Sequence, residues 1–423
     1  MSPVRPTVQV VGLRLDPQHY ALRDFLTRIA QPHEWHDGGS PAAEALLDAH
    51  GAAAAPLPVV IDGEAVIAGA TVEQLARAWN ARTPPARSHY DMAIIGAGPA
   101  GLAAAVYAAS DGLSTLLVER DVPGGQAGHT SLIENFLGFP EGIGGAELAR
   151  LAGRQAERFG AEIVMLRGVT GHEMAADGTV VLSLDGDLTV GARIALAAPG
   201  MEWRRLGAPG IDELIGRGVY YGAGRSEAAQ CGGDDVLVVG AGNSAGQAVL
   251  NLADAGARVA MLVRGSDLAR TMSAYLVDRI EAHPLIDVRL ETQVAEAHAD
   301  GDHLGSVTIA DAGGRTERRP ARALFLCIGG RPRTAWAAGA GVRTDGAGYI
   351  LTGPDLLESG RRPAEWPLDR DPLALETSVP GLFAAGDVRH GSAKRVGGAA
   401  GEGAMAVALA HRRVEELERA GSA

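Results

Sequence analysis

Two glycine-rich turns constrain this chain of 423 residues more than any other feature. The first reads GAGPAG at residues 96–101 and the second reads GAGNSAG at residues 240–246, each after a short apolar run. Glycines permit a tight strand-to-helix turn and the close approach of a pyrophosphate, which the free N–H groups of the following helix bind. Two such turns predict an α/β chain with two Rossmann-like dinucleotide-binding domains, and electrons that move between two nucleotides.

The residues after each turn indicate which dinucleotide it binds. The next predicted strand, residues 114–119, ends at Glu119, where a carboxylate would accept a hydrogen bond from a ribose hydroxyl. After the second turn, the predicted strand 259–264 ends at Arg264, with Arg270 nearby. Basic side chains at this place suit the 2′-phosphate of NADPH. The alternative is that both arginines are merely solvated on a loop.

Charge and cysteine content exclude several classes of function. The formal net charge is −13 and the pI is about 5.4, which argues against nucleic acid or an anionic membrane as a partner. No uncharged stretch is long enough to span a bilayer, and residues 1–5 lack the apolar core of a signal peptide. Two cysteines exclude a disulfide framework and a four-cysteine metal site. We therefore expect a cytoplasmic protein without a metal.

Residues 1–82 are predicted to form a small domain of their own, followed by a linker at 83–88. The expected elements are strands at 7–15, 33–36 and 57–62, and helices at 17–30, 41–50 and 71–80. This order resembles the glutaredoxin or thioredoxin-like fold, in which the proline before the third strand is cis. Where that family has Cys-Pro-x-Cys, this chain has Asp-Pro-Gln-His at residues 16–19. Thiol chemistry is impossible without the sulfurs, which leaves docking to a protein partner, regulation or packing.

From residue 89 onward, three further motifs carry a resemblance to the thioredoxin reductase-like flavoproteins. They read PGGQAG at 123–128, IENFLGFP at 133–140 and LETSVPGLFAAGDV at 375–388. The resemblance implies an α/β fold with a discontinuous FAD domain, residues 89–207 and 331–423, and an NADPH domain at 208–330 between its parts. It also leads us to expect a homodimer.

The resemblance assigns the cofactor-binding residues. Asp387 is implied to bind the ribityl chain, and the helix that begins at Lys394-Arg395-Val396 stands where the family has Arg-Gln-Ala facing the flavin pyrimidine. One departure is Ala-Pro-Gly at 198–200, where the family has Ala-Thr-Gly. The predicted FAD residues are Gly96, Gly98, Pro99, Ala100, Gly101, Glu119, Arg120, Gly125, Gln126, Asn135, Gly386, Asp387, Lys394, Arg395 and Val396. The predicted NADPH residues are Gly240, Gly242, Asn243, Ser244, Ala245, Arg264 and Arg270.

The redox dithiol of the thioredoxin reductases has no counterpart here. That family has Cys-x-x-Cys-Asp just before the second turn, and Gly222, Arg225 and Ser226 stand at the two cysteine positions and the aspartate position. Cys231 follows alone, and a single thiol cannot carry two electrons as an internal disulfide. It is interpreted either as structural, or as a one-thiol peroxidase or docking site. Cys327, on an apolar strand, is expected to be a buried small hydrophobe.

Three functions therefore remain open. The first is an NADPH:FAD oxidoreductase that reduces an external acceptor directly, like the ferredoxin–NADP reductases of the same fold; the acceptor would be ferredoxin, a quinone, oxygen or a small molecule. The second is a flavoenzyme acting on a small molecule, such as a secondary metabolite, with NADPH dispensable. The third is a non-catalytic flavoprotein that serves as a sensor or scaffold.

The sequence assigns no catalytic side chain, because hydride transfer to a flavin needs geometry more than acid–base groups. The candidates are His129 and His390, which could approach the flavin or an acceptor, and Cys231. Tyr220 and Tyr221 could shield the flavin face that the missing dithiol leaves open. The alternatives are solvated loop histidines and tyrosines that pack at a domain junction.

Overall fold

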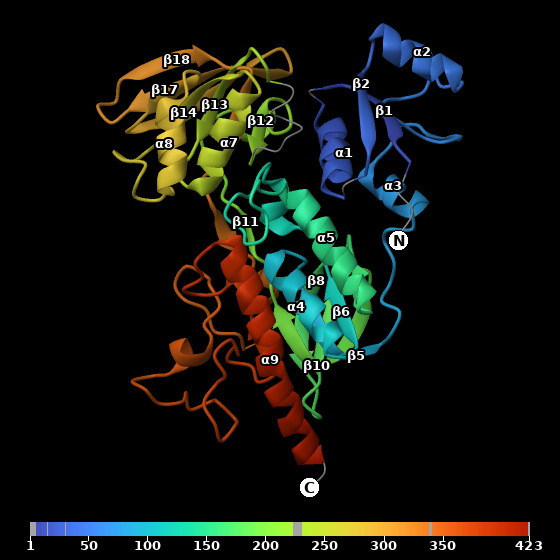
Figure 1. The fold of residues 1–423 in the computed structure, drawn as a ribbon, viewed down its shortest axis with the longest axis vertical. Coiled ribbons are helices and arrows are strands. Elements are labelled where there is room, and N and C mark those ends of the chain that lie inside the picture. Colours follow the sequence, from blue (N-terminus) through green and yellow to red (C-terminus); the bar gives the residue numbers. More distant parts are fainter. Residues whose placement is uncertain (1–5, 15, 30, 223–230, 338–340, 422–423) are drawn as a thin grey trace. The chain divides into compact units, whose positions relative to one another are not determined.

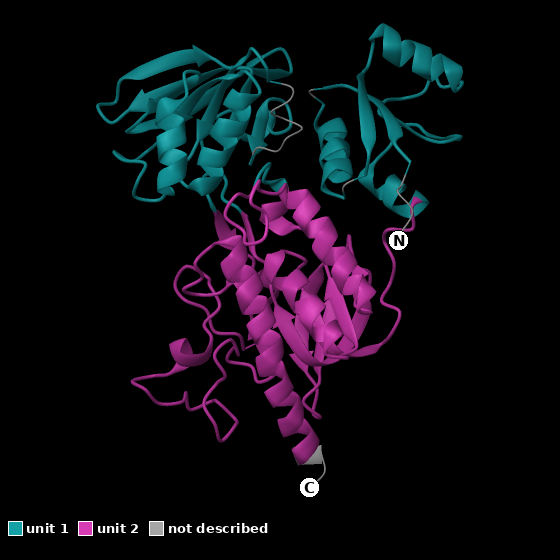
Figure 2. Cartoon of the chain, in the orientation of Figure 1, with its two compact units in different colours: residues 1–78, 129–132, 203–329 teal, residues 79–128, 133–202, 330–423 magenta. Residues whose placement is uncertain are grey.

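The computed structural model describes residues 6–421 except residues 15, 30, 223–230 and 338–340 (Figure 1). The chain forms two compact units (Figure 2). The first contains residues 1–78, 129–132 and 203–329, and the second contains residues 79–128, 133–202 and 330–423. The finer domain limits expected from the sequence, at 82, 207 and 330, stay predictions.

The N-terminal part of the first unit is a four-stranded sheet with three helices. Its elements are β1 (Val8–Gly12), α1 (Pro17–Arg28), β2 (His33–Asp37), α2 (Pro41–Ala49), β3 (Val59–Asp62), β4 (Ala65–Ile67) and α3 (Val72–Ala78). The strand order is β2-β1-β3-β4, with β1 parallel to β2 and antiparallel to β3. The predicted order of strands and helices is confirmed, and the Leu57–Pro58 peptide bond is cis. The structure adds β4, which is too short to show an alternating pattern in the sequence.

The remainder of the first unit is built on a five-stranded parallel sheet. Its strands, in spatial order, are β12 (Val219–Tyr221), β19 (Ala323–Leu326), β13 (Asp235–Val239), β14 (Arg258–Leu262) and β15 (Ile286–Arg289). The other elements are η2 (Asp212–Leu214), α7 (Asn243–Asp254), α8 (Ala274–Ala282) and the antiparallel strands β16 (Thr292–Asp300), β17 (His303–Asp311) and β18 (Thr316–Pro320). Both faces of the parallel sheet are buried: Val236 and Val238 belong to one apolar cluster, and Leu237 between them belongs to another. This is the burial expected of a parallel sheet covered on both sides.

The second unit contains a seven-stranded mixed sheet of order β7-β6-β5-β10-β9-β8, with β21 paired to β10. Its strands are β5 (His89–Ile95), β6 (Thr115–Val118), β7 (Glu162–Val164), β8 (Val169–Met174), β9 (Val180–Leu184), β10 (Leu188–Ala197) and β21 (Leu382–Ala384). Its helices are α4 (Pro99–Ser110), α5 (Gly145–Arg158) and α9 (Val396–Gly421), and its short turns are η3 (Ala335–Ala337), η4 (Gly353–Leu356) and η5 (Gly386–Val388). The short pair β11 (Met201–Trp203) and β20 (Gly330–Pro332), and η1 (Gly125–His129), lie where the chain passes from one unit to the other.

Two helices of the second unit pack closely enough to require a glycine. A Cβ atom at Gly403 of α9 would overlap the carbonyl oxygen of Ala100 in α4. In Figure 1, α4 lies between α5 and α9. The long C-terminal helix therefore fixes the start of α4, where the first glycine turn lies. Among the described helices, none combines the length and the apolarity needed to cross a membrane.

Candidate functional site

The first glycine turn joins β5 to α4, and its glycines have three different tasks. Gly96 has a φ of +97°, and a Cβ there would overlap the carbonyl oxygen of Ala198. A Cβ at Gly101 would overlap the carbonyl oxygen of Gly96. By contrast, a Cβ at Gly98, the N-cap of α4, would meet nothing within 4 Å. The open space lies at the free N–H groups of a helix, which is the place that suits a pyrophosphate.

Glu119 follows β6 and holds this turn from the neighbouring strand. Its side chain is only 6% exposed, its Oε2 accepts a hydrogen bond from the Ala97 N–H at 2.7 Å, and its Oε1 accepts one from Asp121 at 2.9 Å. The structure therefore gives Glu119 a role in shaping the turn. Its predicted hydrogen bond to a ribose stays a prediction.

Two loops converge on the same turn. A Cβ at Gly125 would lie 3.3 Å from Cα of Gly98, and a Cβ at Gly386 would lie 3.0 Å from Cβ of Ala100. Gly125 and Gly386 both have positive φ angles, of +55° and +77°. The structure thus brings together three predicted FAD motifs that lie far apart in the sequence. Gln126, also predicted, donates a hydrogen bond to the carbonyl of Met201 at 3.3 Å, whereas Asn135 and Arg120 are exposed.

Asp387 lies in η5 beside the turn and is poorly satisfied. Among the described residues, its hydrogen bond comes from the Ser392 hydroxyl at 3.4 Å. Burial raises the pKa of Asp387, although the positive charge of Lys394 opposes the shift. A half-buried carboxylate with spare acceptor capacity fits a ligand hydroxyl such as those of a ribityl chain. The predicted contact of Asp387 with FAD stays a prediction.

Helix α9 begins at Val396, two residues after the predicted start at Lys394, and the two basic residues before it have partners within the second unit. Lys394 has a φ of +52°, and its Nζ donates a hydrogen bond to the Tyr349 hydroxyl at 2.6 Å. Arg395 donates to the carbonyl of Lys394 at 3.2 Å. The N-terminus of the helix, rather than these side chains, is then the group available to stabilise negative charge.

Two residues beside the first turn were missed by the sequence analysis. Arg333, after β20, has a buried Nε with no hydrogen-bond partner among the described residues. Burial and the nearby Arg120 lower its pKa, while Glu119 opposes the shift. Glu402 of α9 accepts hydrogen bonds from the Gly386 N–H at 2.7 Å and from Arg389 at 2.6 Å, which fixes η5. The only sequence signal for Arg333 is its place after a predicted strand, and Glu402 has none.

The second glycine turn joins β13 to α7 and repeats the geometry of the first. Gly240 has a φ of +145°, and a Cβ there would overlap the carbonyl oxygen of Cys327. A Cβ at Gly242 would meet nothing within 4 Å. Asn243 exchanges two hydrogen bonds with Ser273, at 2.9 Å and 2.8 Å, which ties the start of α7 to the start of α8. Ser244 is exposed and Ala245 is buried.

Arg264 and Arg270 are both exposed, beyond the carboxyl end of β14. Neither forms an ion pair with a described residue. The carboxyl ends of parallel strands are the edge at which α/β sheets bind nucleotides. Both guanidinium groups are exposed at this edge, and their predicted binding of a 2′-phosphate stays a prediction.

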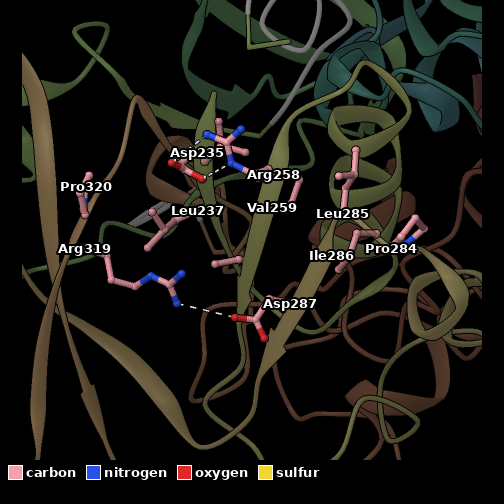
Figure 3. Close-up of a pocket in the computed structure, with 12 residues that line it drawn as sticks. Asp235, Leu237, Arg258, Val259, Pro284, Leu285, Ile286, Asp287, Arg319 and Pro320 are labelled. Carbon is pink, nitrogen blue, oxygen red and sulfur yellow. Dashed lines mark hydrogen bonds and ion pairs between the residues drawn. The ribbon is translucent and has the colours of Figure 1, made fainter. Parts of the chain in front are cut away.

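A cavity of about 320 Å³ opens at the opposite edge of this sheet (Figure 3). Asp235 and Arg258, the first residues of β13 and β14, line it and are paired with each other at 2.7 Å, and Arg319 and Asp287 form a second pair at 3.6 Å. The glycine turn follows the other end of β13. This cavity is therefore not the dinucleotide site.

The position of the absent dithiol lies directly after β12. Gly222, with a φ of +82°, donates a backbone hydrogen bond to Leu326 at 3.1 Å, and a Cβ there would lie 3.5 Å from Trp203. The other two positions, Arg225 and Ser226, lie outside the described residues. Tyr220 stacks on Phe325 with ring centroids 5.5 Å apart, and the Tyr221 hydroxyl accepts a hydrogen bond from Leu206 at 3.0 Å. The predicted shielding of a flavin face by Tyr220 and Tyr221 stays a prediction.

The two candidate histidines each lie close to an aspartate that is distant in the sequence. The Nδ1 atom of His129 lies 3.5 Å from Oδ1 of Asp24, and that of His390 lies 2.8 Å from Oδ2 of Asp345. Neither cysteine forms a disulfide and both are buried; Cys231 is 6% exposed in the apolar cluster under β13. Burial raises the pKa of Cys327 to about 12. Among the described residues, no group of three His, Cys, Asp or Glu side chains could hold a metal ion.

Comparison with known proteins places this chain in a family. The model of the pyridine nucleotide-disulphide oxidoreductases matches residues 90–403, and the chain belongs to this family. The thioredoxin reductase of Bacillus subtilis is 35% identical over 333 residues, which cover 78% of this chain and 96% of that protein. The thioredoxin reductase of Listeria monocytogenes is 34% identical over 338 residues, which cover 78% and 95%.

Solved structures agree with this assignment. The thioredoxin reductase of T. acidophilum superposes with a TM-score of 0.68 at 28% identity, covering 78% of this chain and all of that one. The Lactococcus lactis enzyme gives a TM-score of 0.68 at 30% identity, covering 77% and 99%. The protein is thus an oxidoreductase of the thioredoxin reductase family. Proteins of this family bind FAD and NADPH, and the two glycine turns of this chain fit these cofactors. The family match begins at residue 90, beyond the N-terminal domain.

Proposed function

We propose that this protein passes electrons from NADPH through FAD directly to an external acceptor, without an internal dithiol. The observation that supports this proposal is that the sequence contains no Cys-x-x-Cys pair. The sequence has two cysteines, Cys231 and Cys327, and neither belongs to a Cys-x-x-Cys pair. Gly222, which has no side chain, stands at the first cysteine position of the family motif.

Neither remaining cysteine is suited to replace that dithiol. Thiolate, rather than thiol, attacks a disulfide, and a thiol with a pKa of about 12 is protonated at neutral pH; this applies to Cys327. Cys231 is buried among apolar side chains. We therefore propose that this chain is not a true thioredoxin reductase, although its relatives in Bacillus subtilis and Listeria monocytogenes carry that name.

The chain's own residues would bind and orient the cofactors. The open N-terminus of α4 at Gly98 would hold the FAD pyrophosphate, and Asp387 would accept a hydrogen bond from the ribityl chain. The N-terminus of α9 would stabilise negative charge on the flavin pyrimidine. Bound FAD supplies the redox chemistry, by accepting a hydride from NADPH. Gly242 and the start of α7, with Arg264 or Arg270, would position the NADPH phosphates.

The proposed external acceptor is ferredoxin, a quinone, oxygen or a small molecule. The N-terminal domain, with Asp16 and His19 at the cysteine positions of the thioredoxin-like motif, would contribute no electrons of its own. We also propose that the protein is a homodimer in the cytoplasm.

The proposal is tested with NADPH added to the FAD-loaded protein under nitrogen, followed by assays with an artificial dye and with thioredoxin. We expect the visible flavin absorbance to bleach, the dye to be reduced and thioredoxin to stay oxidised. A Cys231→Ser variant serves as the matched control and should behave like the wild type. NADPH-dependent thioredoxin reduction that is lost in Cys231→Ser would overturn the proposal and make Cys231 the redox centre.

A further inference from the structure

One face of α1 contacts residues that lie outside the N-terminal domain. Pro17, Tyr20 and Asp24 are spaced at i, i+3 and i+7, so they lie on the same side of the helix. Each of them meets a residue beyond that domain but within the first compact unit. The partners are Gly216, Tyr220 and His129, respectively.

The contact at Pro17 requires a glycine on the other side. A Cβ at Gly216 would lie 3.0 Å from both Cα and Cβ of Pro17, and Gly216 has a φ of +78°. The backbone of the turn before β12 therefore lies directly against the first residue of α1. Any side chain at position 216 would force the two apart.

The contact at Tyr20 connects the helix to an apolar core. Its ring centroid lies 5.0 Å from that of Tyr220, with the rings tilted by 45°, and Tyr220 in turn stacks on Phe325 of β19. Tyr20 packs against the apolar cluster under the parallel sheet. Aromatic pairs of this geometry contribute about 0.5–1.5 kcal/mol beyond their area burial.

The contact at Asp24 adds a polar interaction with His129. Its Oδ1 lies 3.5 Å from Nδ1 of His129, and its Oδ2 lies 3.6 Å from Nη1 of Arg28. Burial alone would raise the pKa of Asp24, but the hydrogen bond and charge of His129, together with Arg28, outweigh it and lower the pKa. The carboxylate is therefore ionised at neutral pH and favours this docked arrangement.

The N-terminal end of α1 is also closed to chemistry of its own. Asp16 caps the helix by accepting hydrogen bonds from Gln18 at 2.8 Å and His19 at 3.2 Å. The Nδ1 atom of His19 accepts a hydrogen bond from the Leu13 N–H at 2.7 Å, and the side chain is buried. The residues at the two cysteine positions thus stabilise the start of the helix. This end of the domain can therefore contribute a binding surface but no reactive group.

We propose that Gly216, Tyr220 and His129 form a docking surface for a thioredoxin-fold domain, and that the N-terminal domain of this chain occupies it in cis. The domain has a β2-β1-β3-β4 sheet and presents the helix that carries the degenerate thioredoxin-like motif. A tethered domain competes at a high effective concentration, so it excludes a separate protein of the same fold. The domain is therefore a built-in competitor of thioredoxin-fold proteins.

The test compares two double variants of the full-length, FAD-loaded protein. Tyr20→Ala/Asp24→Asn removes the contact between the rings of Tyr20 and Tyr220 and weakens the contact of Asp24 with His129. The control, Tyr20→Phe/Asp48→Asn, keeps the ring and neutralises an exposed aspartate on α2. The readouts are amide hydrogen exchange of residues 129–132 and 216–222, and binding of a bacterial thioredoxin whose active-site cysteines are replaced by serine. Neither readout involves NADPH or electron transfer, so the result is independent of the proposed function.

We expect the first variant, and not the control, to exchange about tenfold faster at both segments, which corresponds to about 1.4 kcal/mol. We also expect it to bind the added thioredoxin at least about tenfold more tightly than the wild type does, because the competitor is released more often. Unchanged exchange would show that the domain does not cover this surface. Faster exchange without tighter thioredoxin binding would show that the surface is not a docking site for this fold. If the first variant misfolds, His129→Asn is used instead, because it changes the contact with Asp24 without altering the N-terminal domain. It is judged by the same two readouts.

Discussion

The first residue of each glycine turn excludes a side chain in the same way. A Cβ at Gly96 would overlap the carbonyl of Ala198, and a Cβ at Gly240 would overlap the carbonyl of Cys327. The second glycine of each turn, Gly98 or Gly242, faces open space at the start of a helix. The local requirement for a pyrophosphate is therefore met twice by the same geometry.

The surroundings of the two turns are different. Around the first turn, Glu119 is buried, and the loops that carry Gly125 and Gly386 approach within van der Waals contact. Around the second, the charged residues Arg264 and Arg270 are exposed. An enclosed turn suits a cofactor that stays bound, and an open one suits a nucleotide that must leave in each cycle. The surroundings of each turn, rather than its glycine motif, therefore distinguish the predicted FAD site from the predicted NADPH site.

The largest effect is expected from a methyl group inside the first turn. Gly101→Ala places a Cβ on the carbonyl oxygen of Gly96, where the backbone has no room to yield. We expect a loss of at least about 3 kcal/mol in the free energy of unfolding and a protein that purifies without flavin. Gly98→Ala, whose Cβ meets nothing within 4 Å, is the matched control: it should fold normally and bind FAD more weakly. Thermal unfolding and flavin content measure both. Equal behaviour of the two variants would argue against the assigned geometry.

The next largest effect is expected on FAD binding at the first turn. Asp387→Ala removes a charge-assisted hydrogen bond to FAD, worth about 1.5–3 kcal/mol, or roughly ten- to a hundredfold in Kd. Fluorescence titration of the apoprotein with FAD measures the change. Asp345→Ala, which removes the carboxylate that pairs with His390, is the control and should bind FAD normally. An unchanged Kd in Asp387→Ala would remove Asp387 from the FAD site.

A smaller effect is expected at the open site, because exposed charges are screened by water and salt. Arg264→Ala should weaken NADPH binding by about 1 kcal/mol, or roughly fivefold, and leave NADH binding unchanged. Arg270→Ala tests the alternative phosphate ligand, and Arg258→Ala at the opposite edge of the sheet is the control. Equal losses for NADPH and NADH would show that Arg264 does not recognise the phosphate.

The smallest effect is a pH dependence of the apoprotein. Burial raises the pKa of Asp387 above its unfolded value, so the ionised carboxylate costs the folded apoprotein stability at neutral pH. This cost disappears as the pH falls through the raised pKa. Asp387→Asn should therefore raise the Tm of the apoprotein slightly at neutral pH, and the difference should vanish at acidic pH. A variant that is less stable than wild type at neutral pH would contradict this account.

The sequence predicted the features that depend on neighbouring residues. Both turns and the place of Glu119 after β6 follow from local patterns, and the structure has them there. The last helix was predicted from the resemblance to begin at Lys394, and it begins at Val396. The element order of the N-terminal domain was also predictable, because its strands and helices are separated by clear turn residues.

Features that depend on long-range packing were not predictable. The approach of Gly386 to Ala100, and the buried Nε of Arg333 beside the same turn, exist only once the chain is folded. The pairing of His390 with Asp345 is of the same kind, since nothing in either local sequence indicates it. The contact between Tyr20 and Tyr220 joins two predicted domains, and no periodicity within either domain anticipates it.

The central claim, that the flavin is the last electron carrier within the chain, is tested most directly by an anaerobic reductive titration of the FAD-loaded protein. FAD alone accepts one electron pair, whereas a flavoprotein with a redox-active dithiol accepts a second pair as its disulfide opens. We predict that one electron pair per flavin reduces the protein completely, and that Cys231→Ser gives the same endpoint. Uptake of a second pair per flavin in the wild type would contradict the account.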